Sequence, residues 1–204
     1  MLFNSYAFIW LFLPVVWGVF FLAARYRHEA AAAWLALASL FFYGYWDMHY
    51  VPLLLLSITV NYQISKQISR NIENGLQRQA KLWLIAGLVF DLGLLGHYKY
   101  TRFFLENWVA LTGSDINLVD IILPLGISFF TFTQIAYLAD CYKGIVKERN
   151  PIHYLLFITY FPHLIAGPIL HHKQMMPQFA QTKTYSISQE NIAIGLTIFA
   201  IGMF

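Results

Sequence analysis

The stretch Ile121–Lys143, which reads IILPLGISFFTFTQIAYLADCYK, decides the fold of this chain. It is long and apolar enough to cross a lipid bilayer, which takes about 20 helical residues. On a helix that turns about 100° per residue, four polar side chains of this stretch share one stripe of about 120°: Thr133, Gln134, Tyr137 and Asp140. Lipid cannot satisfy such groups, so the stripe faces either an internal cavity or neighbouring helices. The pattern leaves both alternatives open.

The composition of the whole chain indicates a membrane protein. Of its 204 residues, 59% are hydrophobic and 11% are charged, whereas about 25% of an average soluble domain is charged. We therefore expect an all-α polytopic membrane protein with about six or seven transmembrane or re-entrant helices in a single domain, residues 1–204. A net charge of +3 without a basic stripe gives no reason to expect a nucleic-acid partner. A single cysteine excludes a disulfide framework, and the histidines lack metal-ligand spacing, so no metal site is expected.

The apolar runs predict where the helices lie. They are Leu2–Ala24, Ala30–Tyr45, Val51–Ile64, Leu82–Tyr98, Ile121–Ala139, Ile152–Leu170 and Ile192–Phe204. Polar connections are expected at Lys66–Lys81, Thr101–Asp120, Lys143–Asn150 and His171–Ser188. The first run is long and has no basic residues before it, which indicates a retained helix rather than a signal peptide, and Pro14 predicts a kink in it. Whether Val51–Ile64 spans the membrane or re-enters it stays open.

The basic residues predict the orientation. Nine of the 13 lysines and arginines follow the odd-numbered runs: Arg25, Arg27, Lys66, Arg70, Arg78, Lys81, Lys143, Lys147 and Arg149. The other four follow the even-numbered runs: Lys99, Arg102, Lys173 and Lys183. Because basic loops stay in the cytoplasm, the N-terminus is expected outside it.

The last apolar run is shorter than a membrane span. Ser186 and Gln189 form a candidate capping box, and the helix would then end at Phe204 after about 20 Å of apolar rise. We therefore expect this chain to be the N-terminal part of a longer membrane domain.

Three stretches carry a resemblance to a known family. The first is Pro124–Asp140 with Tyr142-Lys143-Gly144, the second is Tyr160–Pro168 with Pro177-Gln178-Phe179, and the third, weaker one is Leu92–Tyr100. Together they resemble the membrane-bound O-acyltransferases. Within that family the chain is most similar to the bacterial branch of alginate O-acetylation proteins and the D-alanyl-lipoteichoic acid transfer protein.

The resemblance implies a fold, an activity and partners. The fold would be part of a ring of helices around a tunnel in the bacterial inner membrane. An activated acyl donor, such as acetyl-CoA or an acyl carrier, would arrive from the cytoplasm as a substrate, with no bound cofactor. The acyl group would pass to hydroxyls of an exported polysaccharide such as alginate, directly or through a periplasmic acetyltransferase. The family's catalytic histidine lies in the later half of such proteins, so this chain alone is expected to be inactive.

Five residues are candidates for lining the tunnel: Gln134, Tyr137, Asp140, His163 and Asp91. His163 lies between Pro162 and Gly167-Pro168, whose presence predicts a broken helix, and there it either acts as a general base or binds a freed carbonyl. The resemblance favours the second reading, because related proteins often carry another polar residue there. Asp91 lies in mid-span, where a carboxylate costs about 2.5–3.5 kcal/mol. It either lines a cavity or bonds to another helix, and the resemblance favours the bond, since asparagine is common at this position.

Two other classes of protein remain as alternatives. A secondary transporter would explain the broken helix and the intramembrane carboxylate, although no repeat relates two halves of the chain. A non-catalytic membrane scaffold would explain the absence of a nucleophile–base pair.

Overall fold

The structure is a computed structural model that describes residues 2–113, 122–146, 149–164 and 172–203. Within these ranges every regular element is a helix, which confirms the all-α prediction. In chain order the elements are η1 (Phe8–Phe12, a π-helix), α1 (Leu13–Ala24), α2 (His28–Gly44), η2 (Met48–Tyr50), α3 (Val51–Glu73), α4 (Gln77–Thr112), α5 (Ile127–Tyr142), α6 (Pro151–Thr159), α7 (Phe161–Leu164), α8 (His172–Ala180), η3 (Thr182–Tyr185) and α9 (Gln189–Met203).

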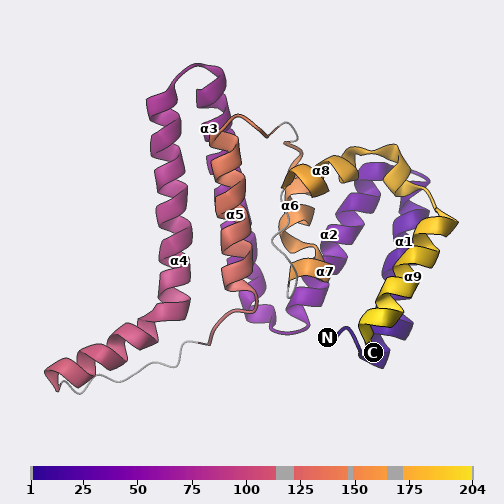
Figure 1. The fold of residues 1–204 in the computed structure, drawn as a ribbon, viewed down its shortest axis with the longest axis horizontal. Helices are drawn as coiled ribbons and strands as arrows, with labels where there is room; N and C mark the ends of the chain where they lie inside the picture. The colour runs from indigo at the N-terminus through magenta and orange to yellow at the C-terminus, as the bar shows by residue number, and fades with distance from the viewer. Residues whose placement is uncertain (1, 114–121, 147–148, 165–171, 204) are drawn as a thin grey trace.

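The helices form two packed groups joined through α6 and α7. In the first group α3 packs against α4 and α5, and in the second α1 packs against α2 (Figure 1). Helix α6 contacts α2 as well as α3 and α5, so it connects the two groups. We name the end of the bundle that holds the α1–α2 and α3–α4 turns the basic face, and the end that holds η2 the opposite face.

The N-terminal helix adapts to its proline with a wider turn. Pro14 lies in the first turn of α1, and the preceding residues of η1 form a π-helix rather than an α-helix. A proline ring clashes with the carbonyl four residues earlier, and a π-turn moves that carbonyl away. The sequence predicted a kink at Pro14, and the structure instead has a local change in helix type just before it.

The predicted loop Lys66–Lys81 is wrong. Helix α3 continues to Glu73 and α4 begins at Gln77, with Gly75 at φ +73° in the tight turn between them. The polar residues that suggested a loop divide between two sides of α3, because Ser65 and Ser69 are buried while Lys66 and Arg70 are exposed. Polarity here therefore marks a helix with two different sides rather than a break in the helix.

The predicted connection Thr101–Asp120 is also wrong in its first part. Helix α4 runs on to Thr112 and ends at Gly113, whose φ of +66° closes the helix in the left-handed conformation. Figure 1 shows the C-terminal part of α4 turning away from the other helices. Among the described residues α4 is the helix that is both long and apolar enough to cross a membrane, and Phe8–Ala24 is a shorter apolar stretch.

Helix α5 begins six residues later than the predicted start at Ile121. Its N-cap is Gly126, at φ +68°, and Pro124 precedes it. A Cβ atom at Gly126 would lie 2.9 Å from the Leu164 carbonyl oxygen, so the absence of a side chain lets α7 approach the start of α5.

The run Ile152–Leu170 is broken, as its prolines predicted. Helix α6 ends at Thr159, Tyr160 has an extended ψ of 108°, and α7 restarts at Phe161 with Pro162 in its first turn. Gly167-Pro168 lies outside the described residues. Leu164 lies at the N-terminal end of α5, whereas His172 contacts Asp140 near the C-terminal end of α5.

Two basic residues therefore lie on a different face from the one predicted. The segment His171–Ser188 was expected to be a polar connection on the opposite face, yet it holds α8 and η3, which lie at the basic face (Figure 1). Tyr185 stacks on His28 at 4.5 Å, next to the α1–α2 turn. Lys173 and Lys183 consequently join the other basic residues, which strengthens the charge asymmetry between the two faces.

The last helix is capped two residues later than the capping box predicted. The backbone N–H of Asn191 donates to Ser188 Oγ at 3.3 Å, so Ser188 caps α9, whereas Ser186 Oγ donates to the Lys183 carbonyl. Most of α9 is exposed, including Ile194, Leu196, Ile198 and Ile201.

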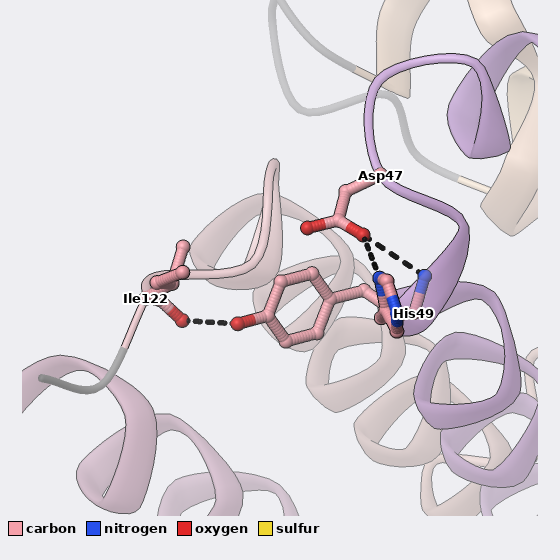
Figure 2. Close-up of polar contacts among 4 residues, drawn as sticks. Asp47, His49 and Ile122 are labelled. Atoms are coloured by element: carbon pink, nitrogen blue, oxygen red, sulfur yellow. Dashed lines mark hydrogen bonds and ion pairs between the residues drawn. The ribbon is translucent and has the colours of Figure 1, made fainter.

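The opposite face is held together by η2. Asp47 Oδ1 accepts hydrogen bonds from the backbone N–H of His49 at 2.9 Å and from its ring at 3.0 Å, and these bonds lower the pKa of Asp47 (Figure 2). The Tyr50 hydroxyl donates to the Ile122 carbonyl at 2.6 Å, which ties the start of α3 to the segment before α5 (Figure 2).

Candidate functional site: a buried polar network

The polar stripe of α5 faces the interior of the bundle. Thr133, Gln134 and Tyr137 are buried, whereas Phe132 on the other side of the helix is 46% exposed. The apolar side of α5 therefore faces outward and the polar side faces protein, as expected of a helix in lipid.

Gln134 joins three helices. Its Nε2 donates to Ser57 Oγ of α3 at 3.0 Å, and its Oε1 lies 3.5 Å from the Tyr154 hydroxyl of α6. Gln134 is fully buried, so both ends of its amide depend on these partners.

Asn61 and Asp91 extend the network to a fourth helix. Asn61 Nδ2 on α3 donates to Asp91 Oδ1 on α4 at 2.7 Å and to the Ser57 carbonyl at 3.1 Å. Asp91 is 1% exposed and Asn61 is fully buried. The predicted bond from Asp91 to another helix is therefore present.

Asp140 lies at the end of the stripe and binds α8. Its Oδ2 is 3.1 Å from His172 Nδ1, with the two side chains 16% and 5% exposed. The His172 ring also meets the Tyr137 ring edge-on at 5.6 Å between centroids. A carboxylate on one ring nitrogen fixes the tautomer and orientation of a histidine, so Asp140 positions His172 against α5.

His163 lies apart from this network, at the N-terminal end of α5. It is 5% exposed, and its ring lies 5.6 Å from the rings of Phe129 and Tyr160. Its ring nitrogens make no hydrogen bond of good geometry with the described residues, but the backbone of Phe157 lies close enough to interact with the ring. His163 therefore does not join the other four candidates.

The basic face carries an ion pair between α3 and the α5–α6 connection. Arg149 donates to Glu73 at 2.7 Å, and this hydrogen bond lowers the pKa of Glu73. Arg149 also offers its carbonyl to the Tyr62 hydroxyl at 2.9 Å. The start of α6 is thus attached to α3 at two points.

Four members of these contacts were absent from the candidates that the sequence suggested. Ser57, Asn61, Tyr154 and His172 come from helices whose polar spacing is less obvious than that of α5. A signal existed for α3, because Ser57, Asn61 and Ser65 repeat every four residues within an apolar run. The spacing of the histidines gave no sign of His172, which joins these contacts only through Asp140; His171 lies outside the described residues.

An apolar groove lies beside α7. Its volume is about 640 Å³, and most of its lining comes from α1, α7, α8 and η3, including Trp17, Phe20, Phe161 and Phe179. The described residues hold no group of three or more histidine, cysteine, aspartate or glutamate side chains that would bind a metal ion.

Comparison with known proteins finds relatives that match nearly the whole chain. The chain is 42% identical over 231 residues to the peptidoglycan O-acetyltransferase of Helicobacter pylori, a match that covers 100% of this chain and 43% of that protein. It is 38% identical over 210 residues to the probable alginate O-acetylase AlgI of Pseudomonas aeruginosa, covering 99% of this chain and 38% of that protein. A shorter match, 44% identical over 46 residues, covers 22% of this chain and 12% of the teichoic acid D-alanyltransferase of Bacillus subtilis.

These matches confirm the resemblance found in the sequence. The chain is homologous, over nearly all of its length, to proteins named as O-acetyl-transferring enzymes. These relatives belong to the membrane-bound O-acyltransferases, the family that the motifs of this chain resemble. The chain spans about two fifths of the length of these relatives, 43% in one case and 38% in another. No model of a protein family matches the chain, and no solved structure does.

Proposed function

We propose that this chain forms part of a multi-pass membrane O-acetyltransferase that modifies hydroxyl groups of a cell-envelope or exported glycan. The observation that carries the proposal is homology along nearly the whole chain to relatives named for peptidoglycan and for alginate O-acetylation. The reaction is attack of a glycan hydroxyl on the carbonyl carbon of an activated acetyl group. The proton of the hydroxyl passes to a general base, and the donor's carrier leaves.

The proposed donor is acetyl-CoA or an acetylated carrier that approaches from the cytoplasm. The acceptor is peptidoglycan or an exported polysaccharide such as alginate, reached directly or through a periplasmic acetyltransferase. Gln134, Tyr137 and Asp140 line the path as positioning residues, while the catalytic histidine belongs to a part of the enzyme beyond these residues. A transporter or scaffold finds no support in relatives that are named as enzymes.

The proposed orientation in the bacterial inner membrane places the basic face in the cytoplasm and the N-terminus outside it. Cys141 itself is a poor reporter because it is 2% exposed. In a Cys141→Ala background, a cysteine at exposed Asn74 reports the basic face and one at exposed Met48 reports the opposite face. An impermeant thiol reagent should label only M48C in spheroplasts and only N74C in inverted vesicles. The reverse pattern contradicts the orientation.

The activity is tested by complementation. A strain that lacks its glycan O-acetylation membrane protein receives the full-length protein that contains these residues, and ester-linked acetate is measured on peptidoglycan and on exported polysaccharide. We expect acetate to return on one of these glycans, which identifies the acceptor. Acetate on neither glycan, at normal membrane abundance, contradicts the proposed function.

Gln134→Leu separates positioning from folding in the same assay. It should lower acetate per unit of membrane protein, since it removes the amide that joins α3, α5 and α6. Thr133→Val is the matched control, because the Thr133 hydroxyl is buried on the same helix but bonds only to the Phe129 carbonyl of its own helix. Equal loss of acetate and of abundance in Q134L would mean that the network is structural packing alone.

A further inference from the structure

One part of the polar network carries two buried oxygen atoms that lack a hydrogen bond. They are Asn61 Oδ1 and Asp91 Oδ2, and neither has a donor within reach among the described residues. Their residues are 0% and 1% exposed, so bulk water cannot supply the missing bonds. A buried acceptor without a partner is costly, and a buried unpaired carboxylate costs far more.

The remaining atoms of the two side chains are already committed. Asn61 Nδ2 has two hydrogens, and it uses them on Asp91 Oδ1 at 2.7 Å and on the Ser57 carbonyl at 3.1 Å. The orientation of the Asn61 amide is therefore set, because turning it over would place its oxygen against two acceptors. The amide consequently cannot also serve Asp91 Oδ2.

No basic side chain neutralises Asp91. No ion pair joins it to a lysine, arginine or histidine among the described residues, and its hydrogen-bond partner is the neutral amide of Asn61. The Tyr154 hydroxyl of α6 is directed to Gln134 rather than to Asp91. A charged Asp91 would thus stand alone between α3 and α4.

A single proton resolves both defects. A carboxylic acid and a primary amide are complementary: the amide N–H donates to one acid oxygen while the acid O–H donates to the amide oxygen. The first of these two bonds is present at 2.7 Å, and the two oxygens without donors are the remaining oxygen of the amide and the remaining oxygen of the carboxyl group. Adding the proton converts an uncompensated charge into a closed, neutral ring of hydrogen bonds.

We propose that Asp91 and Asn61 form a buried proton-binding site in which Asp91 is a neutral carboxylic acid that donates to Asn61 Oδ1. The site holds the contact between α3 and α4 without placing a charge inside the bundle. It is independent of the acetyl transfer proposed above, since it requires only the described residues of these two helices.

The protonated carboxyl is tested by infrared spectroscopy of the full-length protein in lipid nanodiscs at neutral pH. The C=O stretch of a carboxylic acid is separate from the stretches of a carboxylate, so the difference spectrum of wild type minus Asp91→Asn should contain one acid band. The control Asp47→Asn removes an exposed carboxylate, and its difference spectrum should contain carboxylate bands instead. Carboxylate bands alone in the Asp91 spectrum overturn the proposal.

Stability distinguishes the proton from a metal cation. Asp91→Asn can donate to Asn61 Oδ1 without a titratable proton, so its melting midpoint should stay close to that of wild type. Asp91→Leu cannot, and its midpoint should fall by roughly 2–8 °C. The swapped pair N61D/D91N again sets one acid against one amide and should regain the acid band that D91N loses. Equal falls for D91N and D91L, or a wild-type midpoint that rises with sodium while that of D91N does not, would overturn the proposal.

Discussion

The two packed groups of helices bury different kinds of side chain. Between α3, α4, α5 and α6 the contacts include amides, hydroxyls and a carboxyl, such as the bond from Gln134 to Ser57 and that from Asn61 to Asp91. Between η1, α2 and α7 the side chains in contact are mostly aromatic rings, beside a hydrogen bond from Trp34 Nε1 to the Val16 carbonyl of α1 and one from the Phe161 N–H to Ser39 Oγ. These rings are Phe3, Phe8, Phe12, Phe41, Phe42 and Phe161.

The difference shows how each group is specified. Hydrogen bonds are directional and depend on particular atoms, so the α3–α6 group has one arrangement that satisfies its polar atoms. Ring packing depends on shape and tolerates replacement by side chains of similar volume. In the proposed membrane setting, apolar side chains would gain little by moving from the bilayer into protein, so close packing rather than the hydrophobic effect would hold the ring cluster together.

The largest expected effect lies where the two groups meet. Gly126→Ala should destabilise the protein by about 2–4 kcal/mol, because the new Cβ would be 2.9 Å from the Leu164 carbonyl oxygen and φ is +68°. Thermal unfolding in detergent measures the loss. Gly18→Ala on α1 is the control, since its Cβ meets no atom within 4 Å and the change should be neutral or slightly stabilising. Equal behaviour of the two variants would mean that α7 does not pack closely on α5.

The next effect tests the polar group. Gln134→Leu should cost about 2 kcal/mol, because it leaves Ser57 Oγ and the Tyr154 hydroxyl without their partner inside the bundle. Unfolding midpoints of Q134L and of the control Thr133→Val give the comparison. If T133V loses as much stability as Q134L, the hydrogen bonds of Gln134 to other helices contribute no more than the hydrogen bond of Thr133 within its own helix.

A smaller effect is expected when a buried residue of the ring cluster is replaced by leucine, the same residue that replaces Gln134. Phe42→Leu should cost about 1 kcal/mol, although Phe42 is fully buried, because leucine fills much of the same volume and leaves no polar atom unpaired. Its exposed neighbour Phe41, also replaced by leucine, sets the baseline. The contrast between the groups fails if F42L is less stable than Q134L.

The smallest effect is on the basic face. The pKa of Glu73 is lowered in the folded protein by Arg149, so its contribution is fully present above the unfolded-state pKa and is lost as pH falls through the lower folded-state pKa. Glu73→Gln should therefore reduce stability slightly at neutral pH and not at all in strong acid, with the neutral-pH difference shrinking in high salt. A double-mutant cycle with Arg149→Gln isolates the pair. A difference that grows toward low pH would contradict this sign.

Much of the architecture was visible in the sequence because it follows from local spacing. The stripe of Thr133, Gln134 and Tyr137 predicted which side of α5 faces protein, and these residues are buried. Pro162 predicted the break before it, whereas at Pro14 the sequence predicted a kink and the structure has a π-helix. The tunnel-lining roles of the five candidates stay predictions, since the contacts within the described residues are those of helix packing.

The errors share a cause. Helix ends were read from where apolar runs stop, yet α3 and α4 continue through charged residues because an exposed helix side tolerates them as well as a loop does. Lys173 and Lys183 were assigned to the opposite face because a run of apolar length was taken to cross the bundle once.

The sequence by itself determined the helical class, the side of α5 that faces protein and the family, since each depends on residue types at fixed separations along the chain. The tertiary structure alone decided the partners: Asn61 with Asp91 is a contact across 30 residues, Gln134 with Ser57 one across 77, and Asp140 with His172 one between α5 and α8. No spacing rule encodes such pairs, because they depend on how helices rotate and slide against one another. Only the packed bundle sets the rotation and the sliding of the helices. These two quantities decide which buried oxygen atoms lack a hydrogen-bond donor.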